Sequence, residues 1–333
     1  MTSSNNQQEE TGRASEANSR RGTVLKKSLG EYTVECDGAT ITCSISSTLR
    51  KVLVYPYADP SSRRPTVDKV EDIRQVDPVA IGDYVEFIDT GDDSGMITEV
   101  LPRRNKLSRR AAGPKPLEQV IVANVDQVIP VVSIAKPKLK WALLDRYLAD
   151  AESADIPSLI CVTKMDLASD DITDEARVYE NIGYTVILTS AMSGQGIEEL
   201  KEALTDQVSV FVGKSGVGKT TLLNAIQPGL GLRVAEVSQV TGKGKHTTSH
   251  LELFKLECGG AVVDTPGMRE FGLWESEKVN PAYLFREMRP FLGQCRFGAD
   301  CSHTHEPGCA VKQAVESGKI AQHRYESYIK MRR

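Results

Sequence analysis

The stretch of this sequence with the most specific chemistry is a glycine-rich turn that ends in lysine and threonine, Gly213-x-x-x-x-Gly218-Lys219-Thr220. Apolar VSVFV precedes it and TTLLNAI follows it, which predicts a strand, a turn and a helix. Backbone N–H groups in such a turn point at phosphate oxygens, at the positive end of the helix dipole. Lys219 would reach the β- and γ-phosphates of a nucleotide, and Thr220 would bind Mg²⁺. The residues expected to form this phosphate loop are Gly213, Lys214, Ser215, Gly216, Val217, Gly218, Lys219, Thr220 and Thr221.

Two further segments offer ligands to the metal ion and the terminal phosphate. AVVDTPG is an apolar strand that ends in Asp264-x-x-Gly267, where Asp264 would hold Mg²⁺ through water and the Gly267 N–H would contact the γ-phosphate. The segment GKGKHTTSH contains Thr247-Thr248, which should supply the switch ligand to Mg²⁺ and the γ-phosphate. Placed after a phosphate loop, these segments predict a nucleoside triphosphate site.

A base-reading motif, Thr163-Lys164-Met165-Asp166, lies upstream at the end of another apolar strand. The Asp166 carboxylate would accept from guanine N1–H and the exocyclic amine, a donor pair that adenine does not present, so a buried carboxylate would reject ATP. The Lys164 stem would cover the base. Ser190-Ala191, which ends the strand TVILTSA, would bring a backbone N–H to the guanine O6.

The order of these motifs indicates a circular permutation. In ordinary Ras-like GTPases the order of motifs is phosphate loop, switch threonine, DxxG, NKxD and SA. In this chain the order is TKMD, SA, phosphate loop, HTT and DTPG. Each motif is present once, in cyclic rotation, with the new ends just after DTPG. A parallel sheet tolerates this rearrangement when its old termini lie close together.

The hydrophobic pattern predicts a multidomain chain. Residues 1–20 contain three apolar side chains and are expected to be disordered. Short alternating strands over 21–112 favour an all-β OB-fold barrel that binds RNA. Alternating strands and helices over 113–273 predict an α/β, circularly permuted P-loop GTPase domain, including QVIVANVDQVIPVVSI as a buried strand. The polar remainder, 274–333, is expected to be mostly helical.

Composition limits the classes of partner and compartment. The net charge of −4 gives no global attraction to nucleic acid, so an RNA contact needs a local patch. LPRRNKLSRRAAGPKP (101–116) has basic residues and no acidic ones, and it is either such a phosphate-backbone contact or a solvated linker. The chain has no apolar run long enough to cross a bilayer and no secretory signal. With seven cysteines, this favours reduced thiols in a cytoplasm.

A cysteine–histidine cluster follows the GTPase motifs in the sequence. Cys295-x5-Cys301-x-His303-x5-Cys309 offers three thiolates and an imidazole, a set that suits tetrahedral Zn²⁺, although unliganded thiols would also fit the pattern. His305 is a competing ligand. Few large apolar residues lie nearby, so the metal would be structural rather than catalytic.

Nearly the whole chain, from about Arg21 onward, resembles the circularly permuted RsgA (YjeQ) GTPase family. The resemblance is carried by LPRRN, ANVDQV, LDRYL, GKSGVGKTTLLNAI, KGKHTTSHLELF, DTPGMREF, HEPGCAVKQAVESG and RYESY. It implies a GTPase that binds the small ribosomal subunit and its rRNA, is stimulated by that subunit and acts in late maturation. It also implies GTP/GDP, Mg²⁺ and one structural Zn²⁺ as ligands, with His303 rather than His305 on the zinc. Other assembly factors are further candidate partners, and we expect a monomer with no membrane contact.

The sequence departs from the family pattern at two points: Thr163 stands where Asn is usual, and one extra residue precedes Cys301. A further feature concerns hydrolysis, because Met268 occupies the position of the water-orienting Gln of Ras-like enzymes. We hypothesise that His246 positions or polarises the water, as the resemblance also implies, and a solvated loop histidine is the alternative. Lys219 and Thr248 complete the expected catalytic group. Two other functions remain as alternatives: a GTP-switched RNA-binding module with incidental hydrolysis, and a general P-loop ATPase.

Overall fold

The computed structural model describes residues 19–28, 30–50, 53–54, 69–70, 77–111, 117–168, 172–230, 251–264 and 279–332. Contacts divide these residues into two compact units: one runs to Asn124 and includes 251–253, and the other contains Val125 and the remaining residues. Among the described helices, none combines the length and apolar character that a membrane span needs.

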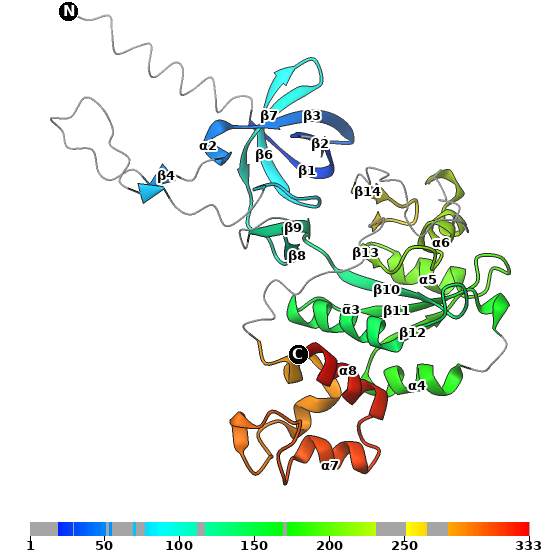
Figure 1. Ribbon diagram of the computed structural model, residues 1–333. Helices are drawn as coiled ribbons and strands as arrows, with labels where there is room; N and C mark the ends of the chain where they lie inside the picture. The colour runs from blue at the N-terminus through cyan, green and yellow to red at the C-terminus, as the bar shows by residue number, and fades with distance from the viewer. Residues whose placement is uncertain are drawn as a thin grey trace, which may run out of the picture. The chain divides into compact units, whose positions relative to one another are not determined.

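The first unit contains a closed five-stranded barrel, drawn in blue to cyan in Figure 1. Its strands are β1 (Ser19–Ser28), β2 (Glu31–Cys36), β3 (Ala39–Ile45), β6 (Tyr84–Gly91) and β7 (Ser94–Val100). They pair in the order β1-β2-β3-β7-β6, and β6 pairs with β1 again, which closes the sheet. Only the β3–β7 pairing is parallel. This is the connectivity of an OB-fold, as the sequence predicted.

Alternation along the strands produces the barrel core. In β2, every second residue is buried, beginning with Tyr32. Gly22 allows β1 to cross β2 closely, because a Cβ there would lie 2.5 Å from both Glu35 O and Val34 Cγ1. The buried apolar residues are Val24, Tyr32, Val34, Cys36, Ile41, Cys43, Val79, Val85, Phe87 and Ile97. Shorter elements of this unit are α2 (Ser47–Arg50), β4 (Leu53–Val54) and β5 (Lys69–Val70).

The stretch expected to be one buried strand, QVIVANVDQVIPVVSI, is divided into two. β9 (Glu118–Ala123) forms an antiparallel hairpin with β8 (Lys106–Arg110), and β10 (Gln127–Ser133) begins the second unit. Asn124 breaks the strand by adopting φ +57°. Its side chain accepts from the Arg104 N–H and donates to Gly82 O, so the amide replaces the lost strand hydrogen bonds.

The second unit is built on a parallel sheet in the order β12-β11-β10-β13-β15. Its other strands are β11 (Leu159–Thr163), β12 (Thr185–Leu188), β13 (Val208–Val212) and β15 (Ala261–Asp264). β14 (Glu252–Lys255) begins in the first unit and ends in the second. The helices of the second unit are α3 (Trp141–Ser153), α4 (Thr173–Ile182), α5 (Ile197–Leu204) and α6 (Lys219–Ile226), with short turns η1 (Met165–Leu167) and η2 (Pro228–Leu230). Strands next to each other in this sheet are far apart in the sequence.

Both faces of the sheet are covered, so its strands are apolar on both sides. Ile129 and Val131 pack with residues of α5 and α6 on one face, whereas Val132 packs with residues of α3 and α4 on the other. Figure 1 shows these helices flanking the green strands. A doubly covered parallel sheet is the α/β architecture predicted for the GTPase domain.

The C-terminal region packs on α3 within the same unit. It contains η4 (Pro281–Leu284), η5 (Arg286–Phe291), η6 (Gly298–Asp300), α7 (Ala310–Glu316) and α8 (Gln322–Arg332). Its small core includes Phe285, Met288 and Tyr328, and Ala149 of α3 contributes to that core. Irregular turns and two short helices agree with the prediction of a mostly helical region.

A buried ion network joins α8 to α3. Arg324 is 1% exposed and donates to Asp145, which is 0% exposed, over 2.7 Å. The same guanidinium donates two hydrogen bonds to the Glu287 carboxylate, at 2.6 and 3.1 Å. The Tyr179 hydroxyl also donates to Asp145. Burial lowers the Arg324 pKa, but the charges of the Asp145 and Glu287 carboxylates together raise it above its ordinary value.

We expect Arg324→Met to lower the free energy of unfolding of this unit by about 3–5 kcal/mol, because the Asp145 carboxylate would stay buried without its cation. Urea denaturation followed by circular dichroism would measure the change. Arg177→Met is the matched control, since Arg177 and Asp174 are exposed and such pairs contribute less than about 1 kcal/mol. Equal unfolding midpoints for the two variants would contradict the stabilising role of the network.

Candidate functional site: a nucleotide pocket and a Cys₃His cluster

The phosphate loop (213–218) has the backbone geometry that an anion cradle requires. It connects β13 to α6, and Gly216 and Gly218 adopt φ +83° and +99°. A Cβ at Gly213 would lie 2.4 Å from Val131 O of the neighbouring strand, so only glycine fits there. Lys219 is 7% exposed and its Nζ donates to Gly213 O over 2.8 Å, which folds the side chain back along the loop.

The base motif touches the phosphate loop directly. The Thr163 hydroxyl lies within hydrogen-bond distance of Val217 O and, at 3.2 Å, of Val132 O. The Lys164 ammonium donates to Gly216 O over 2.7 Å. β11, which carries the motif, and β13, which carries the loop, are both hydrogen-bonded to β10. The upstream and downstream motifs therefore form one site.

A left-handed backbone conformation and a second hydrogen bond place the Lys164 side chain against the phosphate loop. Lys164 adopts the left-handed conformation with φ +64°, and its Nζ also donates to the carbonyl of Lys136. Partial burial lowers the Lys164 pKa, the nearby Asp166 carboxylate raises it, and the Lys136 charge lowers it. The stem of the side chain lies near the loop, with Cε 3.8 Å from a Cβ built at Gly218.

The Asp166 carboxylate is exposed and oriented by a neighbouring loop. The Ser190 hydroxyl donates to Asp166 Oδ1 over 2.6 Å, and the Ser193 N–H donates to that hydroxyl oxygen. The Met165 N–H donates to Thr189 O, which joins the two loops through the backbone. The sequence motif predicted a backbone role for the Ser190-Ala191 pair and did not reveal this side-chain contact of Ser190.

The backbone N–H groups of Ser190 and Ala191 differ in whether they are already hydrogen-bonded. The Ser190 N–H donates to Gln195 O within the turn. Within the described part of the chain, the Ala191 N–H has no hydrogen-bond partner. Of the two residues, Ala191 is the one with a donor available to a base.

The remaining predicted nucleotide ligands divide into two sets. Thr220 and Thr221 lie in the first turn of α6, and Lys214 and Ser215 are exposed on the loop. The backbone of Asp264 ends β15, where it pairs with Phe211 of β13, two residues before the phosphate loop. The residues that lie outside the described residues are His246, Thr247, Thr248, Gly267 and Met268.

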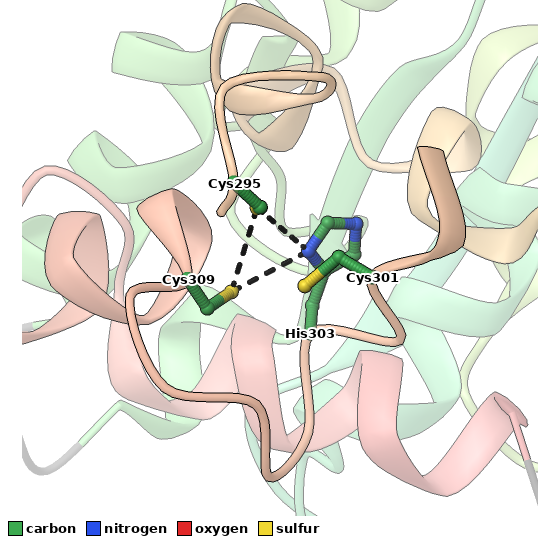
Figure 2. Close-up of side chains that lie close together, drawn as sticks. All are labelled: Cys295, Cys301, His303 and Cys309. Atoms are coloured by element: carbon green, nitrogen blue, oxygen red, sulfur yellow. Dashed lines mark hydrogen bonds between the residues drawn. The ribbon is translucent and has the colours of Figure 1, made fainter. Parts of the chain in front are cut away.

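The four predicted metal ligands converge in the C-terminal region (Figure 2). Their side chains are all buried, and their ligand atoms lie within 4.8 Å of one another. His303 Nδ1 is 3.5 Å from the sulfurs of Cys295 and Cys309, which are 3.8 Å apart. A tetrahedral ion with metal–sulfur bonds of ~2.3 Å has sulfur–sulfur edges of ~3.8 Å. The donor set and its spacing fit a single zinc ion, and His305 is exposed beside it.

The backbone around the cluster is held by residues that the motif spacing did not reveal. The Ala310 N–H, at the start of α7, donates to Cys295 Sγ over 3.3 Å. Burial alone would raise the Cys295 pKa, but this bond and others lower it, which favours the thiolate. Burial lowers the His303 pKa and keeps the imidazole neutral, as a ligand must be. The Glu306 carboxylate accepts from the Ser302, Thr304 and His305 N–H groups and so fixes the loop.

Comparison with known proteins agrees with this geometry. A family model described as RsgA GTPase matches residues 100–274. A protein of Chlorobaculum tepidum named small ribosomal subunit biogenesis GTPase RsgA is 47% identical over 260 residues, which cover 75% of this chain and 83% of that protein. Its namesake from Moorella thermoacetica is 40% identical over 310 residues, covering 92% and 94%.

Two solved structures share the fold. YjeQ from Thermotoga maritima superposes with a TM-score of 0.67 at 35% identity, covering 94% of this chain and 97% of that one. YloQ, described as a circularly permuted GTPase, gives a TM-score of 0.65 at 33% identity, covering 94% and 93%. With its motifs in rotated order around one pocket, this chain belongs to the RsgA GTPase family and is an enzyme that hydrolyses GTP.

Proposed function

We propose that this GTPase binds the small ribosomal subunit and hydrolyses GTP, stimulated by that subunit, during its late maturation. The names of the relatives support a role in biogenesis of the small subunit. The observation that carries the proposal of GTP hydrolysis is the contact of Thr163 and Lys164 with the phosphate-loop carbonyls. In this proposal the barrel within 21–112 and the region 274–333 contact rRNA, while 113–273 hydrolyses GTP. The protein acts as a monomer in the cytoplasm, where it meets the subunit and its other assembly factors.

One set of residues would recognise the guanine base, and another would bind the phosphates. Asp166, oriented by Ser190, accepts from guanine N1–H and the exocyclic amine, and the Ala191 N–H donates to O6. Lys219 and the loop N–H groups bind the β- and γ-phosphates. Thr220 and Asp264 would hold Mg²⁺, which neutralises charge on the phosphate oxygens when it is bound. Thr248 and Gly267 would contact the γ-phosphate from the switch segments.

Hydrolysis requires a group that orients water, and the sequence supplies a candidate in place of the usual glutamine. Met268 has no useful donor or acceptor, so turnover without a partner should be slow. His246, beside Thr247-Thr248, would orient or polarise the water once the ribosomal subunit is bound. This requirement for a partner would time GTP hydrolysis to a subunit-bound state.

Cys295, Cys301, His303 and Cys309 would hold one zinc ion that stabilises the C-terminal region rather than taking part in hydrolysis. The cluster is buried in the core formed by Phe285, Met288 and Tyr328. The Tyr325 hydroxyl donates to His303 O and the Tyr328 hydroxyl to Ser302 O, so α8 packs directly on the ligand loop. Loss of zinc would therefore disturb the surface offered to rRNA.

Purified small subunits should raise the GTP turnover of the wild-type protein strongly, and His246→Ala should abolish most of that rise by removing the group that orients water. Phosphate release with and without subunits measures both effects. GTP affinity and cosedimentation with subunits serve as controls and should not change. Full subunit-stimulated turnover in His246→Ala would exclude the catalytic role, and no stimulation of the wild type would favour an RNA-binding module with incidental hydrolysis.

Thr163→Val should weaken GDP and GTP binding by roughly tenfold or more, because Val217 O would lose a buried donor worth about 1–3 kcal/mol. Thr163→Asn is the matched variant, since its amide can donate to the same carbonyl and should retain affinity. Titration with a fluorescent GDP analogue measures both. Equal affinity of Thr163→Val and wild type would show that this contact does not support the pocket.

Cys309→Ser should reduce bound zinc from about one ion per chain to well below that, and it should lower the thermal stability of the C-terminal region. Elemental analysis of the purified protein gives the zinc content. Cys258→Ser is the control, because Cys258 lies outside the cluster and should leave zinc unchanged. Wild-type protein prepared without chelator that contains no zinc would contradict the assignment.

A further inference from the structure

A group of four exposed lysines lies beside the nucleotide pocket, and three of them belong neither to the phosphate loop nor to the base motif. Three of them occur in the short loop between β10 and α3, whose sequence IAKPKLK contains no acidic residue. The fourth is Lys214 of the phosphate loop. We name this group the lysine rim; its members are Lys136, Lys138, Lys140 and Lys214.

The structure brings the rim together on one surface. Lys138, Lys140 and Lys214 line the same shallow hollow, whose floor includes Leu143 and Val217. Lys136 lies next to it, because its carbonyl accepts from Lys164 Nζ, and its charge contributes, after burial, to lowering the Lys164 pKa. The rim is thus a local concentration of positive charge in a chain whose net charge is −4.

The loop that carries these lysines is fixed rather than loosely tethered. The Ser133 hydroxyl donates to Pro137 O over 2.8 Å, and the Ile134 N–H donates to Thr163 O. Together with the Lys164 bond, these contacts hold the loop backbone against the base motif. The backbone that carries these lysines is therefore already ordered, and a ligand would have to order only their side chains.

The rim has no counter-charge of its own among the residues that the structure describes. All four side chains are exposed, and none of them forms an ion pair there. Neighbouring like charges repel weakly in water, so a bound anion would lower the electrostatic energy of this arrangement. Lys219 and the loop N–H groups are the proposed ligands of the nucleotide phosphates, so the three lysines of the loop between β10 and α3 can bind a second, extended anion.

We propose that the lysine rim binds the phosphate backbone of rRNA at the mouth of the nucleotide pocket. This inference rests on the proposed function, because the ribosomal subunit is the polyanion that this enzyme would meet. Lysines that neutralise phosphates release counterions, so the contact would be strongly dependent on salt. RNA bound here would lie against the phosphate loop and the base motif, next to the bound GTP.

The test compares Lys138→Gln/Lys140→Gln with wild type in binding to purified small subunits across a series of salt concentrations. For two lost phosphate contacts, the slope of log affinity against log salt should become less steep by about 1.4–1.8 (~0.7 for each contact with a single strand and ~0.9 with a duplex), with weaker binding at every salt concentration. Lys138→Arg/Lys140→Arg keeps the charge and should retain the slope. Lys201→Gln, on α5 and outside the hollow, controls for general loss of charge.

GTP association is measured on the same variants, because the rim could instead steer the nucleotide. Unchanged subunit binding with slower GTP association in Lys138→Gln/Lys140→Gln would assign the rim to the nucleotide and overturn the proposal. Weaker subunit binding with an unchanged salt slope would also overturn it, since no phosphate charge would then be neutralised. Failure of the wild type to bind subunits would instead remove the proposed function, and this inference with it.

Discussion

The nucleotide site depends on the hydrogen bonds that Thr163 and Lys164 donate to carbonyls of the phosphate loop. A loop that turns its N–H groups toward phosphate must turn carbonyls the other way, and such carbonyls need donors when they leave water. The end of β11 supplies those donors. The residues that read the base therefore also hold the phosphate cradle, so either half of the pocket would lose its geometry without the other.

This dependence explains why the rotated order of the motifs is compatible with function. β11 and β13 both pair with β10, so the distance from the base motif to the loop is set by hydrogen bonds across the sheet rather than by the path of the chain. β15, on the far side of β13, brings Asp264 to the same edge by the same means. Cutting the chain after DTPG leaves each of these pairings intact.

The sequence predicted those parts of the site that local spacing defines. The phosphate loop and the Cys₃His ligands are of this kind, because the ligand geometry itself fixes which residue types can occur at which separation. The Ser190 hydroxyl on Asp166 depends on a rotamer and on the path of a turn, neither of which alters the sequence pattern. The break at Asn124 was missed because apolar residues continue on both sides of it. Arg324 and Asp145 are far apart in sequence, and nothing local identifies one as the partner of the other.

The contact between the C-terminal region and α3 connects the two parts of the site. Glu152 of α3 accepts from Arg286 and Arg289, and the Tyr184 hydroxyl donates to the same carboxylate. The Arg286 guanidinium also donates to Gly183 O and lies 4.1 Å from the centre of the Tyr184 ring. Tyr184 leads into β12, and β12 leads to Ser190. Of the charged groups in this network, only the Glu152 carboxylate is buried, and the two arginines and the tyrosine hydroxyl supply the hydrogen bonds that it needs there. The contacts of the C-terminal region therefore end at Tyr184, which stands directly before the strand that leads to the base-reading loop.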